Sequence, residues 1–127
     1  MRTLLVSDLI TKLNTISDNQ KSVLVLDRYG KTHKLDIIVR TEDNVFYLFM
    51  YENDGCDLNV DWLECALEEE ASESKWAQNL FDDDRPKFGD CEIMFVHGTR
   101  HDFNTSIKSY LRYDIEEKDD VIILKCQ

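Results

Sequence analysis

The feature that most constrains the fold is a set of five short apolar runs, each rich in β-branched, Leu or aromatic residues. This composition is typical of β-strands, which bury one or both faces in a sheet. Gly30 and the polar stretch 41–44 separate the first three runs and indicate turns. The runs are SVLVLD at 22–27, THKLDIIVR at 32–40, NVFYLFMYE at 44–52, CEIMFVH at 91–97 and VIILKC at 121–126.

Two segments show the periodicity of a helix. Ser7 and Asp8 indicate a helix start, and apolar residues at positions 9, 10, 13 and 16 then form one stripe of a helix that ends near 17–19. A second helix is expected within 52–84, before Pro86, because the residue preceding a proline is driven out of the α region. Its predicted apolar face consists of Val60, Leu63, Ala66, Leu67, Ala71, Ala77 and Phe81.

The stretch TSIKSYLRYDI at 105–115 fits either a helix or a strand. We prefer a strand, because the polar stretch 116–120 leads into the strand at 121–126 and a hairpin accounts for both arms. With 127 residues the chain can form one hydrophobic core but not two ordinary domains. We therefore predict a single α+β domain over 1–127, with a mostly antiparallel sheet of two three-stranded meanders, an N-terminal helix and a central acidic helix.

The formal net charge of −11 is concentrated in one segment. Twelve acidic residues and one basic residue, Lys75, lie between Glu52 and Asp84, whereas the 14 acids and 14 bases of the remainder cancel. Direct binding of nucleic acid is not expected, because phosphate contacts require Lys and Arg. The segregation instead indicates a positively charged partner protein.

On a helical wheel, Asp57, Asp61, Glu64 and Glu68 form a row of carboxylates about 5–6 Å apart. Such a row can occupy a groove that evolved to hold phosphates, and an aromatic side chain rimmed by charge is typical of an interface. The alternatives are a solvated acidic face and tryptophans that pack at the edge of the core. The predicted partner-binding residues are Asp57, Asp61, Trp62, Glu64, Glu68, Glu69, Glu73, Trp76, Asp82, Asp83 and Asp84.

Residues 5–30, LVSDLITKLNTISDNQKSVLVLDRYG, resemble the opening of many short phage and prophage proteins, which pair a DLI-x-KL helix with a VLV-x-D strand and a glycine turn. With its size and acidity, the chain resembles small phage-encoded inhibitors of bacterial defence such as anti-CRISPR proteins. The resemblance implies an inhibitor that binds the basic nucleic-acid groove of a host defence nuclease. An immunity protein or antitoxin against a basic nuclease toxin, and an acidic structural or accessory phage protein, remain open.

No enzyme, metal or cofactor is predicted. Asp82, Asp83 and Asp84 are consecutive and do not readily converge on one cation. The spacing C-x5-H-x3-H of Cys91, His97 and His101 lacks a second cysteine pair for zinc, and an extended strand would hold Cys91 roughly 20 Å from His97, too far for a nucleophile and its base.

The cellular environment is expected to be the cytoplasm of a bacterial host. The four cysteines contain no C-x-x-C pair and favour reduced thiols over disulfides. Asp8 interrupts the N-terminus before a signal-peptide core develops, and no run of 18 apolar residues is long enough to span a membrane.

Overall fold

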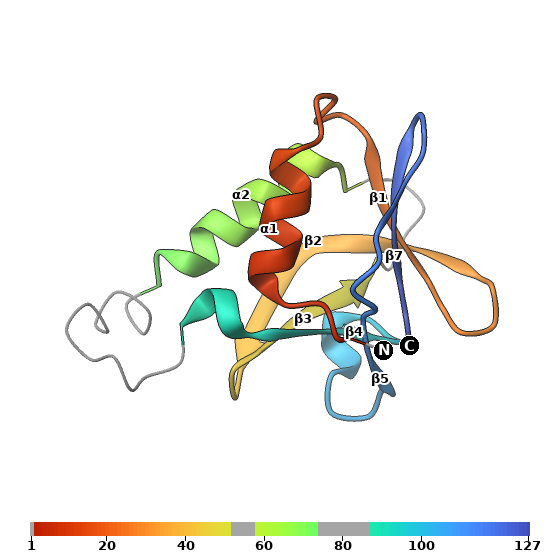
Figure 1. Ribbon diagram of the computed structural model, residues 1–127. Helices are drawn as coiled ribbons and strands as arrows, with labels where there is room; N and C mark the ends of the chain where they lie inside the picture. The colour runs from red at the N-terminus through yellow and green to blue at the C-terminus, as the bar shows by residue number, and fades with distance from the viewer. Residues whose placement is uncertain (1, 52–57, 74–86) are drawn as a thin grey trace.

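The computed structural model describes residues 2–51, 58–73 and 87–127, and Figure 1 shows their arrangement. Within these ranges seven strands form one sheet in the order β5-β4-β3-β2-β1-β7-β6, and two α-helices, α1 (Val6–Asn14) and α2 (Val60–Ala71), pack against it. The strands are β1 (Ser22–Leu26), β2 (Thr32–Glu42), β3 (Val45–Met50), β4 (Glu92–Val96), β5 (Lys108–Tyr110), β6 (Glu116–Glu117) and β7 (Val121–Lys125), and the short 3-10 helices are η1 (Phe88–Asp90) and η2 (Arg100–Asp102).

The predicted class, a single α+β domain with a mostly antiparallel sheet, is confirmed. The first three strands form the expected antiparallel meander β1-β2-β3. Asp43 and Asn44 join β2 to β3 with positive φ angles of 52° and 63°. Two successive left-handed residues match the twist of a tight hairpin, and Asp and Asn adopt this conformation more readily than other residues with a Cβ.

The second predicted meander is wrong. β5 pairs with β4 and is not a neighbour of β7 in the sheet; the isolated bridge between Leu111 and Cys126 links the residue after β5 to the residue after β7. β7 instead lies between β1, to which it is parallel, and the two-residue strand β6. Its residues Ile122 and Leu124 are fully buried. An apolar strand is better covered by neighbours on both sides than at the edge of a sheet, where it would be exposed to water.

α1 begins at Val6, one residue before the predicted start, and ends at Asn14, before the predicted end near 17–19. The Asp8 carboxylate accepts the backbone N–H of Leu5 at 2.9 Å, so Asp8 satisfies the helix start from inside its first turn. The strand assignment for 105–115 is confirmed only for Lys108–Tyr110.

One hydrophobic core lies between the helices and the sheet. α1 contributes Leu9 and Leu13, and α2 contributes Val60, Leu63 and Leu67. Since β3 and β4 are parallel, the chain must cross over between them, and α2 lies in that crossover. The two ends of the chain lie side by side, as Figure 1 shows. No helix within the described ranges is long and apolar enough to cross a membrane.

β2 contains the irregularity that shapes the surface beside α2. Its register with β3 shifts between Leu35 and Val39, and the Asp36 carboxylate accepts the backbone N–H of Ile38 at 3.1 Å within this bulge. Consecutive residues of a regular strand point to opposite faces, but a bulge changes this direction. Ile37 and Ile38 are both exposed, at 44% and 38%.

Candidate functional site

The N-terminus of α2 is held firmly to the loop between α1 and β1. The backbone N–H groups of Val60 and Asp61 donate to the carbonyl oxygens of Lys21 and Asn19, both at 3.0 Å. Asn59 is the N-cap, and its side-chain oxygen accepts the N–H of Trp62 at 2.8 Å. These bonds satisfy the free donors of the first turn and fix which face of α2 points outward.

The outward face of α2 is strongly acidic. The helix contains five carboxylates and no basic residue, and Glu73 follows shortly after its end. Glu68, Glu69 and Glu70 lie at the C-terminal end, where the helix dipole disfavours negative charge. Within the part of the chain that the structure describes, no α2 carboxylate makes an ion pair. We call Asp61, Glu64, Glu68, Glu69, Glu70 and Glu73 the acidic surface.

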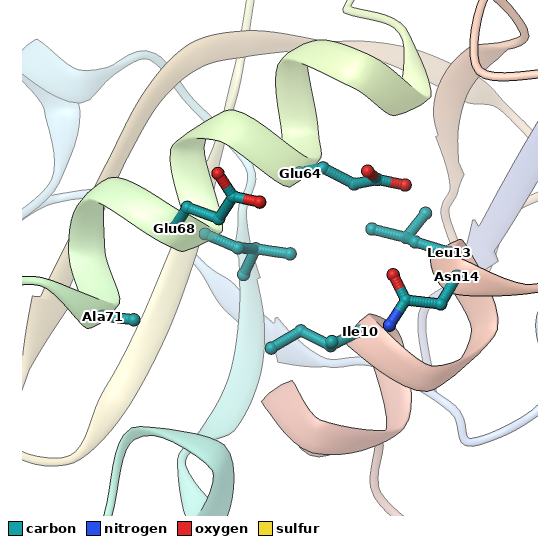
Figure 2. Close-up of a pocket in the computed structure, with 7 residues that line it drawn as sticks. Ile10, Leu13, Asn14, Glu64, Glu68 and Ala71 are labelled. Carbon is teal, nitrogen blue, oxygen red and sulfur yellow. The ribbon is translucent and has the colours of Figure 1, made fainter.

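Two grooves divide the acidic surface. The first, which we call the α1 groove, lies between the two helices, and Figure 2 shows Glu64 and Glu68 of α2 facing Ile10 and Leu13 of α1 across it. Its volume is about 120 Å³. The predicted row of carboxylates is therefore not uniformly exposed. Asp61 and Glu68 are exposed, whereas Glu64 is half-buried at the α1 groove.

The second groove, which we call the β2 groove, is larger, at about 440 Å³. Its lining comes from β2 on one side and α2 on the other, and consists of Ile37, Ile38, Val39, Trp62, Cys65, Ala66, Glu69, Glu70 and Glu73. Glu70 is tied to β2, because the Thr41 hydroxyl donates to its Oε1 at 2.7 Å. The groove thus combines an apolar floor with a carboxylate rim.

Trp62 lines the β2 groove with 54% of its surface exposed. More than half of the Trp62 side chain is therefore open to contact by a partner. Glu69 and Glu73 are exposed and line the same groove. The remaining predicted partner-binding residues, Asp57, Trp76, Asp82, Asp83 and Asp84, lie outside the described residues.

The acidic surface also affects the one exposed thiol among the described cysteines, Cys65. Desolvation and the charges of Asp61, Glu68 and Glu69 raise the pKa of this thiol above its ordinary value of 9.0. Carboxylates disfavour the thiolate, so Cys65 is held in its unreactive protonated form. Cys91 and Cys126 are buried.

A polar cluster that the sequence did not reveal lies on the core face of the sheet. A 2.8 Å hydrogen bond joins His97 Nε2 to Ser109 Oγ, and another of 2.8 Å joins His33 Nε2 to Asp27 Oδ2. The ring of Phe95 lies beside both imidazoles, 5.6 Å from His33 and 5.0 Å from His97, and the two imidazoles are 6.5 Å apart. Strand alternation could have placed His33 beside Leu35 and His97 beside Phe95 on the buried face.

The charges of this cluster are strongly influenced by their surroundings. The hydrogen bond from His33, with backbone donors at Lys31 and Tyr29, lowers the pKa of Asp27 to about 2. Burial and the neighbouring His33 lower the pKa of His97 below its ordinary 6.5. The Asp27 carboxylate orients the imidazole of His33, whereas Ser109, only 5% exposed, bonds the imidazole of His97. We interpret the cluster as a polar connection between the ends of β1 and β4 and the strands β2 and β5.

The three candidate zinc ligands have separate surroundings. Cys91 is 1% exposed, and its thiol donates to the carbonyl oxygen of Lys87 at 3.9 Å. His97 bonds Ser109, and His101 is exposed in η2. Among residues 2–51, 58–73 and 87–127, no group of three His, Cys, Asp or Glu side chains is arranged to hold a metal ion.

Comparison with models of known protein families, with curated proteins and with solved structures finds no match for this chain.

Proposed function

We propose that the acidic surface and Trp62 bind a positively charged partner protein. The partner would be a host defence nuclease, such as a CRISPR effector, and this chain would inhibit it by occupying its nucleic-acid groove. One observation carries this proposal: in the described ranges the α2 carboxylates make no ion pair, although acids elsewhere in the fold do. Like charges on neighbouring turns destabilise a helix, so their retention favours a role outside helix stability.

The geometry supports a protein partner with a basic groove. Side chains one turn apart on α2 present charges about 5–6 Å from one another, as a chain of phosphates presents a line of negative charge. Long-range attraction would raise the association rate, and the exposed indole of Trp62 would slow dissociation. The predicted role is that of an inhibitor and does not involve catalysis.

The test is capture from a bacterial host lysate followed by competition with nucleic acid. The test variant combines Asp61→Asn, Glu64→Gln, Glu68→Gln and Glu69→Gln. A matched control removes four charges elsewhere, by Asp43→Asn, Asp90→Asn, Asp119→Asn and Asp120→Asn. We expect wild type and control, but not the α2 variant, to retain a nucleic-acid-binding protein and to displace its nucleic acid. Retention of the same proteins by all three would mean that α2 is a solvated face.

Salt provides a second test with the purified partner. The screening length falls from about 30 Å at 0.01 M salt to about 3 Å at 1 M, so affinity should fall steeply over this range. The four-charge variant of α2 should show a much shallower dependence. An affinity that is constant with salt contradicts binding through exposed charge.

A further inference from the structure

The β2 groove is lined by apolar, aromatic and carboxylate side chains, a combination that suits one kind of side chain from a partner. Its floor is apolar, from Ile37, Ile38 and Ala66, and Trp62 contributes an aromatic surface. The exposed carboxylates Glu69 and Glu73 line the same groove. A volume of about 440 Å³ lies within the usual range of ligand sites, roughly 300–1,000 Å³.

Two other aromatic rings of the fold, those of Tyr113 and Phe103, have cations of the chain placed over them. The Arg2 guanidinium lies 4.3 Å from the ring centroid of Tyr113, and that of Arg40 lies 4.2 Å from the centroid of Phe103. The Lys108 ammonium lies 4.6 Å from the same Phe103 centroid. Tryptophan is the best of the aromatic acceptors for a cation, yet no cation from the described residues lies over Trp62.

We propose that the β2 groove binds an arginine side chain of the partner protein. The methylene stem would lie on Ile37 and Ile38, and the guanidinium would stack on Trp62 and pair with Glu69, while Glu73, further along the same groove, would add to the attraction. A planar, weakly hydrated guanidinium suits an aromatic face and a carboxylate pair better than the compact, strongly hydrated ammonium of lysine. This inference rests on the proposed function, since it identifies the partner chemistry that the acidic surface recognises.

Other occupants fit less well. A purely apolar segment would desolvate the Glu69 and Glu73 carboxylates without supplying a counter-charge. An anion would be repelled by the rim. A second copy of this chain would bring its own net charge of −11 against the same acidic surface.

The bulge in β2 is the structural device that forms the groove. Without the register shift between Leu35 and Val39, Ile37 and Ile38 would point to opposite faces of the sheet, and only one of them could line the floor. Trp62 on the opposite wall is positioned by the Asn59 cap, so both walls are set by backbone geometry.

The experiment measures binding of three peptides of equal length, with alternating glycine and arginine, lysine or citrulline, by isothermal titration calorimetry. We expect the arginine peptide to bind most tightly and the citrulline peptide not to bind. Trp62→Ala should weaken the arginine peptide by roughly two- to thirtyfold, the range expected for a cation on an aromatic ring. Trp62→Phe should restore part of the affinity.

Charge variants separate groove binding from diffuse attraction. Glu69→Gln with Glu73→Gln should weaken the arginine peptide more than Glu64→Gln with Glu68→Gln, which changes charge at the α1 groove. The remote pair Asp119→Asn and Asp120→Asn is the matched control. Alkylation of Cys65, followed by peptide mapping, should slow when the arginine peptide is bound, because Cys65 lines the β2 groove.

Several results would overturn the inference. Equal binding of arginine and lysine peptides, equal losses from the two glutamate pairs, or full affinity of Trp62→Ala would each show diffuse attraction without a specific groove. The proposed function would survive these results if the four-charge α2 variant still failed to capture the partner. Self-association in sedimentation experiments that Trp62→Ala abolishes would assign the groove to a second copy instead.

Discussion

The two helices of this protein bury similar faces, and each has an acidic residue in its first turn, but they differ in charge at their C-terminal ends. α1 has Asp8 in its first turn and Lys12 in its last, which matches the helix dipole, and both residues are ion-paired, to Arg2 and Glu117. α2 has three glutamates at its C-terminal end and no basic residue there. The charges of α1 therefore match the helix dipole, whereas the three glutamates at the end of α2 oppose it.

The largest expected effect tests the feature that the helices share. Leu9→Ala in α1 and Leu63→Ala in α2 should each lower the free energy of unfolding by about 2–5 kcal/mol, because both side chains are fully buried. Urea unfolding followed by circular dichroism measures the effect. A loss far smaller for Leu63→Ala than for Leu9→Ala would mean that α2 is not fixed by the core.

A smaller effect concerns the start of α2. Asn59→Ala removes the side-chain oxygen that caps the N–H of Trp62 and should lower the free energy of unfolding by about 1 kcal/mol. Asn59→Asp is the matched control, since Asp caps a helix as well as Asn does. Equal losses from both substitutions in urea unfolding would exclude the cap as the cause.

Acid should destabilise the fold through the histidine cluster. Because the pKa of folded His97 is lowered, the unfolded chain binds more protons, and stability falls as pH drops from about 6.5 to the lowered value. His97→Gln should flatten this part of the curve of unfolding free energy against pH. Asp27 contributes to the free energy of unfolding at pH values above 3.8, and this contribution is lost as the pH falls towards its folded pKa of about 2. A wild-type curve that is level below pH 6.5 would contradict this assignment.

The smallest expected effect tests the difference in charge between the C-terminal ends of α1 and α2. Glu68→Gln with Glu69→Gln should raise the free energy of unfolding by a few tenths of a kcal/mol, because the helix dipole disfavours both charges. Lys12→Gln in α1 should lower it by a similar amount. Thermal and urea unfolding at low salt measure both changes. A loss of stability in the α2 variant would show that its charges support the fold.

The same α2 variant has a local readout. Removing two of the charges that raise the pKa of Cys65 should increase the thiolate fraction and speed its alkylation at constant pH. Asp119→Asn with Asp120→Asn should leave that rate unchanged. Equal acceleration in both variants would indicate a general charge effect.

Local sequence patterns determined most of the elements. Alternation and β-branched residues located β1, β2, β3, β4 and β7, because a strand needs only a face or faces that can be buried. The Asp43–Asn44 turn set the β2–β3 hairpin through its positive φ angles. The acidity of α2 and its buried positions Val60, Leu63 and Leu67 were also evident, since helical periodicity is a property of consecutive residues. Of the other residues predicted for that face, Ala66 is half-buried, Ala71 is exposed, and Ala77 and Phe81 lie outside the described residues.

Only the tertiary structure decided which distant segments meet. The placement of β7 beside β1 depends on covering an apolar strand within the sheet, and the hydrogen bond of His97 to Ser109 joins the end of β4 to β5. The bulge that exposes Ile37 and Ile38 beside Trp62 depends on the register of β2 against β3. Periodicity determines the faces of an element, whereas packing against the rest of the core determines its neighbours, so the acidity came from the sequence and the groove from the fold.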